Sequence, residues 1–136
     1  MQIESHLLYS GPGQGPARVT VVGSEAAWDG LGEAITPGLR AKLAPDLDWQ
    51  AKTLVLVFGP RGGAVTGSPR VARFQRRGSH VVLDVVVDPS PPDAPVPAVM
   101  NNPFVALSVE AKALAGDPTI AATWAGMAVG ETKVLR

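Results

Sequence analysis

The side chains that could carry chemistry begin with two histidines, His6 and His80, each on the outward face of an expected strand. A zinc site needs three or four converging ligands, and neither histidine has a cysteine or a second histidine beside it. The chain contains no cysteine, which excludes disulfides, thiolate zinc sites and thiol catalysis. The sequence therefore predicts two solvated histidines and no metal site.

Glycine-rich loops are the second candidate, because backbone amides can hold a phosphate group. The loop at 11–16 has no lysine and does not end in Gly-Lys-Ser/Thr, so it does not match a phosphate-binding loop. No Gly-x-Ser-x-Gly elbow occurs, and spacing singles out no pair of carboxylates. The residues leave an enzyme open only through an assembly of side chains from separate strands.

A third candidate is a cluster of arginines in a stretch of seventeen residues, 61–77, that contains no acid. Its members are Arg61, Arg70, Arg73, Arg76 and Arg77. Such a basic patch fits an acidic protein surface or a nucleic acid. The whole chain has a formal net charge of zero, which gives no electrostatic argument for nucleic acid. The sequence favours a solvated hairpin, balanced by Asp84 and Asp88, over a binding site. If the cluster is a binding site, we expect a protein partner.

The contact residues that we predict lie in a loop and on the strand that follows it. The loop is 59–63, directly after the most apolar run, and loops at strand ends carry sites more often than other loops do. The strand belongs to a hairpin, 71–77 and 79–88, in which Arg73 or Arg70 should lie near Asp84 as a surface ion pair. The predicted contact set is Arg61, Gly62, Gly63, Arg73 and Arg77.

The elements that must position these residues are mainly strands. The run 53–58 is apolar at both alternating sets of positions, which predicts a central strand buried on both faces. Further strands are expected at 3–9, 18–22, 104–109 and, as an edge strand, 128–135, while the Pro-rich segment 89–97 should be an extended surface connection. On the first strand, Ile3, Leu7 and Tyr9 should share a face.

One helix is expected at about residues 24–35. Ser24 is a suitable N-cap, and Trp28, Leu31 and Ile35 form one apolar stripe. Together these patterns predict an α+β, mainly β fold: an antiparallel sheet or small barrel with this helix packed on it. At 136 residues the chain is expected to form a single domain, 1–136.

The sequence also bears on compartment and assembly. Residues 1–6 show no basic or apolar region typical of a signal peptide, and no apolar run reaches membrane-spanning length. The zero net charge favours self-association into a homo-oligomer. These patterns do not select a compartment, and a cytoplasmic or an exported location fits them.

The order of features resembles the PrcB-like C-terminal domain family, which takes its name from a protein of a protease complex. The resemblance is carried by a strand and Trp-bearing helix at 17–28, an Asp-led strand at 48–58, a glycine loop at 59–63 and a Pro-aromatic strand at 102–107. The chain departs from the family pattern where Arg61 precedes the glycine pair, where Ala64 replaces an aromatic residue, and in lacking a lipoprotein signal. The resemblance implies a non-catalytic accessory domain without a cofactor, in a family often exported, with a protease or envelope protein as partner.

The rival hypothesis is a small-ligand-binding or enzymatic domain. It places a pocket between the helix and the sheet, lined by Trp28, Trp49 or Trp124. Such a pocket would be an enclosed cavity with converging polar groups. A third hypothesis, nucleic-acid binding, predicts an affinity that falls steeply with salt.

Overall fold

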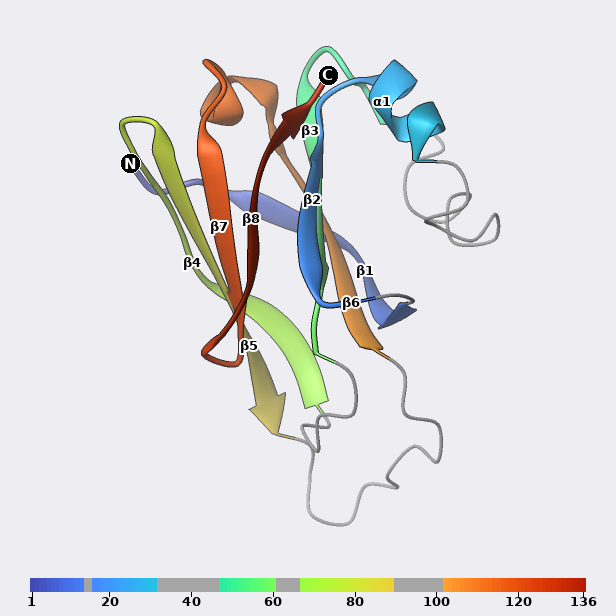
Figure 1. The fold of residues 1–136 in the computed structure, drawn as a ribbon, viewed down its shortest axis with the longest axis vertical. Coiled ribbons are helices and arrows are strands. Elements are labelled where there is room, and N and C mark those ends of the chain that lie inside the picture. Colours follow the sequence, from blue (N-terminus) through green and yellow to red (C-terminus); the bar gives the residue numbers. More distant parts are fainter. Residues whose placement is uncertain (14–15, 32–46, 61–66, 90–101) are drawn as a thin grey trace.

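The computed structural model describes residues 1–13, 16–31, 47–60, 67–89 and 102–136. In these residues eight strands form one sheet in the order β1-β6-β3-β2-β8-β7-β5-β4 (Figure 1). One half consists of β1 (Ser5–Gly13), β6 (Asn102–Glu110), β3 (Lys52–Phe58) and β2 (Arg18–Val22). The other half consists of β8 (Met127–Leu135), β7 (Thr119–Trp124), β5 (His80–Pro89) and β4 (Gly67–Arg77). The mainly β class predicted from the sequence is confirmed.

The sheet is mixed, so the expected antiparallel sheet is wrong in this respect. Strand β2 pairs in parallel with β8, and β5 pairs in parallel with β7, while the other neighbours are antiparallel. The chain leaves β5, runs through β6 in the other half of the sheet and returns to β7. A parallel pair requires such a crossover, and it joins segments too distant for local patterns to reveal.

The sheet curves into a nearly closed barrel, and the N-terminus reaches the far edge strand. Gln2 forms an antiparallel bridge with Gln75 of β4. The Ile3 amide donates to the Phe74 carbonyl at 2.7 Å, and the Arg76 amide donates to the Met1 carbonyl at 2.8 Å. Residues before β1 therefore close one end of the seam between β1 and β4.

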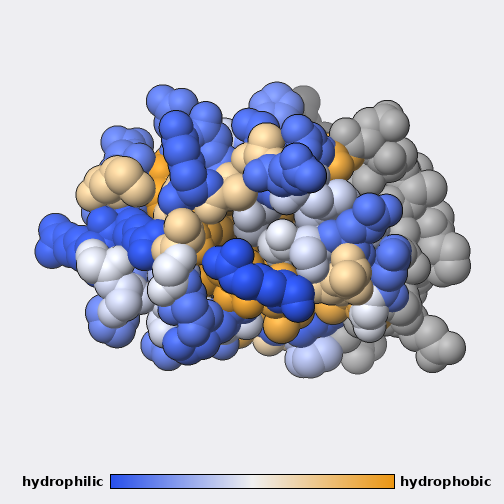
Figure 2. All heavy atoms as spheres, turned by 90° about the horizontal axis from the view of Figure 1, so that it is seen from above, coloured by the Kyte–Doolittle hydropathy of each residue, from blue (hydrophilic) through white to orange (hydrophobic). Residues whose placement is uncertain are grey.

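Strand β3 separates two hydrophobic clusters, as predicted for a strand buried on both faces. Val55 and Val57 belong to the barrel interior, together with side chains from both halves of the sheet. Leu54, Leu56 and Phe58 face the outside of the barrel, where they belong to a second cluster, the outer cluster. Figure 2 shows the molecule from above, and on this face hydrophilic side chains surround and partly overlie apolar residues.

The described helix is shorter than the predicted one. Helix α1 spans Glu25–Gly30, with the Ser24 hydroxyl accepting from the Ala27 amide at 3.1 Å, as an N-cap does. Trp28 is its buried residue and belongs to the outer cluster. The predicted extension to residue 35 lies, from residue 32 on, outside the described residues. The turn at Ala111–Leu114 is a 3-10 helix, η2.

Two local expectations are wrong. The sequence predicts an edge strand at 128–135, but β8 lies between β2 and β7. Its exposed residues, with only Val129 and Val134 buried, reflect one solvated face rather than a free edge. On β1 the register shifts between Leu7 and Tyr9, so Tyr9 packs against the outer cluster while Leu7 lines a cavity. A β-bulge reverses the facing of the residues that follow it.

The described part of the chain contains no helix of the length and apolar character that crossing a membrane requires. The predicted connection at 89–97 lies, from residue 90 on, outside the described residues.

The turn between β7 and β8 places a non-glycine residue in the left-handed region. Ala125 and Gly126 have φ values of 51° and 84°, and a type I′ turn needs positive φ at both positions. We expect Ala125→Asn to raise the free energy of unfolding by about 0.5–1 kcal/mol, because Asn tolerates this conformation better than Ala. Chemical denaturation measures the change. Ala128→Asn, on exposed β8 backbone, is the matched control, and an equal gain there would contradict the explanation.

Gly59, at the end of β3, permits close packing. A Cβ added there would lie 2.7 Å from both Pro103 Cγ and Trp124 Cδ2. Gly59→Ala should therefore lower the free energy of unfolding by about 1–3 kcal/mol through overpacking. Gly30→Ala is the control, since nothing lies within 4 Å of its added Cβ. Equal denaturation midpoints for the two variants would show that the contact with Trp124 relaxes without cost.

Candidate functional site

The structure describes two of the five predicted contact residues, Arg73 and Arg77. Arg61, Gly62 and Gly63 lie outside the described residues. Arg73 and Arg77 lie on β4, four positions apart on its exposed side. Since β4 is a terminal strand of the sheet, the structure places these two arginines at an edge of the barrel.

Arg73 is part of a polar ladder across three strands. Its Nε donates to Asp84 Oδ2 on β5 at 2.7 Å, and the Thr123 hydroxyl on β7 donates to Asp84 Oδ1 at 2.7 Å. The Asp84 side chain is 22% exposed. The predicted pairing of an arginine with Asp84 is confirmed, and Arg73 carries a structural contact as well as an exposed surface.

Of the other arginines of the cluster that the structure describes, Arg70 and Arg76 also have partners and Arg77 is the exception. Arg70 Nε lies 2.9 Å from both carboxylate oxygens of Asp88. Arg76 donates to the Gly78 carbonyl at 2.9 Å and to the Ala113 carbonyl at 3.0 Å. The side chain of Arg77 is exposed and makes no hydrogen bond or ion pair with any described residue. Carboxylates therefore neutralise Arg70 and Arg73, carbonyl groups hold Arg76 without neutralising it, and the Arg77 side chain is the available charge among the described arginines.

The histidines do not form a site together. His80 pairs across the hairpin with Arg77, whereas His6 pairs with Ser108 in the other half of the sheet. Among the described residues no group of three His, Asp or Glu side chains could hold a metal ion. Both histidines are exposed, as the sequence indicated.

The charged side chain of Arg18 on β2 covers part of the outer cluster. Its guanidinium carbon lies 3.7 Å from the centroid of the Phe58 ring, and its Nη1 donates to the Pro16 carbonyl at 2.9 Å. Burial lowers the pKa of this guanidinium, because removal from water disfavours the charged form. The ring face offsets part of that cost.

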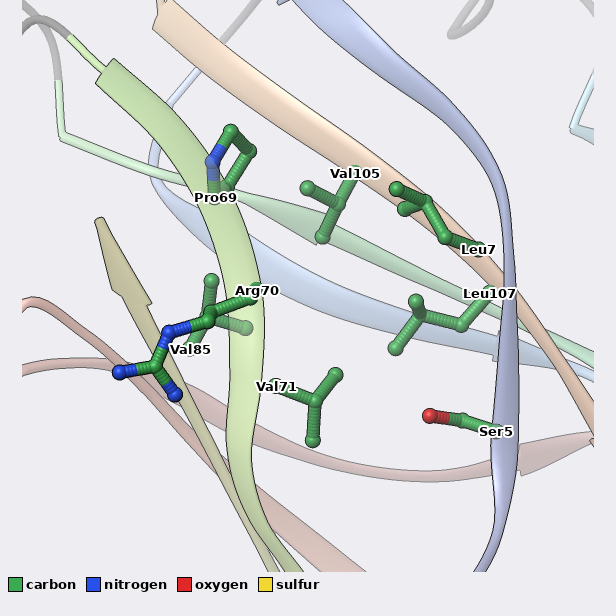
Figure 3. Close-up of a pocket in the computed structure, with 8 residues that line it drawn as sticks. All are labelled: Ser5, Leu7, Pro69, Arg70, Val71, Val85, Val105 and Leu107. Carbon is green, nitrogen blue, oxygen red and sulfur yellow. The ribbon is translucent and has the colours of Figure 1, made fainter. Parts of the chain in front are cut away.

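A cavity of about 250 Å³ lies between the edge strands β1 and β4. Ser5 and Leu7 line it from β1, and Pro69, Arg70 and Val71 line it from β4. Val85, Val105 and Leu107 of the barrel interior complete the lining. Ser5, Leu7, Val71 and Leu107 point into the space between the strands, while the Arg70 guanidinium points away from it (Figure 3).

Sequence reasoning missed this cavity. The available signals were an apolar Leu7, which is 47% exposed in the structure, and a proline at position 69, just before the expected strand 71–77. Proline in a strand marks an edge, but no local signal states that two edges face each other.

The three tryptophans named for the predicted pocket do not lie together. Trp28 and Trp49 lie together in the outer layer, with ring centroids 6.3 Å apart. Trp124 belongs to the barrel interior. None of the three lines the cavity between β1 and β4.

No protein-family model, curated protein or solved structure matches the chain.

The ladder centred on Asp84 gives a prediction about its two partners. A double-mutant cycle between Arg73→Ala and Asp84→Ala should give a coupling of about 0.2–1 kcal/mol that shrinks in about 1 M salt. A cycle between Thr123→Val and Asp84→Ala should give about 0.5–1.5 kcal/mol with less salt dependence, because that bond is partly buried. Chemical denaturation at two salt concentrations measures both.

The pair Arg70 and Asp88 is the control, since both side chains are more than half exposed. Its coupling should be near zero at the higher salt concentration. If its coupling equals that of Arg73 with Asp84 at both salt concentrations, membership of the ladder adds nothing to the strength of the Arg73–Asp84 pair.

Proposed function

We propose that this chain is a non-catalytic protein-interaction domain whose partner binds along β4. The observation that supports this most directly is that β4 is a terminal strand whose edge flanks an apolar cavity. Beyond the bridge at Gln75, the part of the chain described by the structure does not pair that edge. An unpaired strand edge is a template for another chain.

Charge on the same strand adds an orienting contact. Arg77 is exposed and, among the described residues, unpaired, and Arg73 keeps a half-exposed side chain despite its bond to Asp84. Arg77 has an exposed His80 opposite it in the hairpin. This end of β4 therefore favours an acidic group on the partner, which fixes orientation and speeds association more than it adds affinity. Arg61, Gly62 and Gly63, which precede β4 in the chain, remain part of the proposed contact.

The resemblance to PrcB-like domains gives the partner class within this proposal. A protease or an envelope protein is the expected partner, and the domain would act as an accessory module without a cofactor. Nucleic acid fits less well, because Asp84 and Asp88 already neutralise Arg73 and Arg70. A small-ligand pocket fits less well too. The cavity between β1 and β4 is about 250 Å³ and mostly aliphatic, whereas ligand pockets are typically about 300–1,000 Å³ with convergent polar groups.

Capture of partners by a tagged chain tests the proposal. The wild type, Arg77→Glu and Lys133→Glu are compared by quantitative mass spectrometry of lysate and exported fractions. Lys133 is the matched control, because it is an exposed cation three strands away on β8 and changes charge equally. We expect a stoichiometric partner that is retained by wild type and Lys133→Glu and depleted about tenfold by Arg77→Glu, through repulsion of its acidic contact.

Equal retention of the partner by all three proteins would overturn the placement on β4. Stoichiometric recovery of the chain alone would overturn the accessory role and point to a homo-oligomer.

A further inference from the structure

The outer edge of β4 has an occupied end and an unpaired end. At the occupied end, Gln2 forms an antiparallel bridge with Gln75, and Figure 1 shows the N-terminus beside this end of the hairpin of β4 and β5. Arg77 lies beyond the bridge, whereas in the other direction, toward Gly67, the described strands leave the edge unpaired. A partner strand that uses both the unpaired edge and Arg77 therefore meets residues 1–3, the N-terminal clip, which lie between them.

Three hydrogen bonds and one buried side chain hold the N-terminal clip on β4. The Ile3 amide donates to the Phe74 carbonyl at 2.7 Å, and the Arg76 amide donates to the Met1 carbonyl at 2.8 Å. The Met1 amino group donates to the Arg76 carbonyl at 3.0 Å. Ile3 is 5% exposed and belongs to the barrel interior, whereas Met1 and Gln2 are exposed. So short a segment opens locally at a lower free energy than the barrel unfolds.

Glu4 joins the N-terminal clip to the rest of the barrel. It is exposed and lies between the clip and Ser5, the first residue of β1. From Ser5 on, β1 pairs with β6. Hinges are a few residues at the ends of elements that absorb a change of backbone torsion angles. A torsion change at Glu4 can therefore move the clip off β4 while β1 stays paired with β6.

We propose that an extended segment of the partner protein displaces the N-terminal clip and pairs antiparallel with β4 in its place. The clip already occupies this position, so the structure shows that an extended chain fits there. The register of Gln2 opposite Gln75 places one residue of the new strand opposite Phe74 and another opposite Arg77. These two residues are three positions apart and face opposite sides of the sheet. This inference rests on the proposed protein-binding function and deepens it.

The surroundings of the two positions define the chemistry of the segment. The residue opposite Phe74 takes the place of Ile3 in the barrel interior and is aliphatic, because a buried charge would lose its hydration. The residue opposite Arg77 lies on the exposed face and is Asp or Glu, because opposite charges attract across paired strands. The segment therefore reads acid-x-x-aliphatic from its N-terminus. The acid supplies a contact that the clip does not make, which favours the partner in the exchange.

A disulfide that locks the N-terminal clip tests the displacement. Gln2→Cys and Gln75→Cys are combined in the full chain, which contains no other cysteine. The hydrogen bonds flank this pair rather than join it, and such antiparallel pairs have Cα atoms about 4.5 Å apart, within the range of disulfides. Mass spectrometry confirms the disulfide, and thermal unfolding confirms that the oxidised and reduced forms fold.

The probe is a displayed library of short peptides without cysteine, enriched on the reduced double variant. Affinities of the enriched peptides are measured by fluorescence anisotropy on its reduced and oxidised forms and on wild type. Gln75→Cys alone, under the same two conditions, is the matched control for the redox treatment. Arg77→Glu, with Lys133→Glu as its control for charge, tests the acidic position.

We expect the enriched peptides to share the pattern acid-x-x-aliphatic. Their affinity should fall by more than about tenfold on oxidation of the double variant, because the locked clip excludes them, and be unchanged for Gln75→Cys alone. Exchanging the acid for lysine should weaken binding to wild type and Lys133→Glu about tenfold and restore binding to Arg77→Glu.

Amide hydrogen exchange separates displacement from addition of a strand elsewhere. The Ile3 amide loses the Phe74 carbonyl when the clip leaves, so its exchange should accelerate in the complex. The Arg76 amide should stay protected, because a carbonyl of the new strand replaces that of Met1. An Ile3 amide that stays protected in the complex would contradict displacement.

The proposal is also overturned by an absence of enrichment, or by equal affinities for the oxidised and reduced forms. Dimerisation of the chain alone that oxidation abolishes would identify the clip of a second copy as the occupant and overturn the foreign partner. If the captured partner depends on Arg77 but binds the oxidised form equally well, the protein-binding function stands and displacement fails. A captured partner that depends on neither overturns both.

Discussion

The burial of β3 on both faces is the constraint on which the rest of the structure depends. Its residues from Thr53 to Phe58 are almost completely removed from water. A strand with no polar face must be covered by one apolar layer on each side and flanked by strands on both edges, or its backbone groups would lose their partners. Strands β2 and β6 pair with its two edges, the opposite wall of the barrel covers one face, and the outer cluster around Trp28 covers the other.

The second half of the sheet has a different energetic basis. Strands β8, β7, β5 and β4 bury one face in the barrel interior, and their other face carries exposed and half-buried side chains. Side-chain ladders such as Arg73, Asp84 and Thr123 replace a hydrophobic layer there. Such contacts add about 0.2–1.5 kcal/mol each, far less than an apolar layer. The two halves join where β2 and β8 pair over only two residues on each strand, and the shared interior holds them together.

Local patterns in the sequence predicted most of the strands and the helix. The order and direction of the strands in the sheet depend on long-range pairing. The central strand, the Ser24 cap, the hairpin at Gly78 and an ion pair to Asp84 follow from neighbours within a few residues or one turn. The parallel pairs and the inner position of β8 depend on segments far apart in the chain, such as Val21 and Val134. The cavity depends on two bulges, which shift register without a distinctive residue type. The arginine cluster and its balance by Asp84 and Asp88 were both visible in the hairpin, and the structure assigns the pairs as Arg73 with Asp84 and Arg70 with Asp88.

A protein with unpaired edges on β1 and β4 avoids aggregation only if those edges bind few other strands. Proline at 69 removes a backbone donor from β4, and the arginines along that strand oppose stacking of like chains. The bulges on both edges break the regular ladder that an unspecific strand would extend. A partner strand at this seam would also need side chains that fit the aliphatic cavity between Leu7 and Val71. The features that limit aggregation are thus the ones that would make binding at this seam selective.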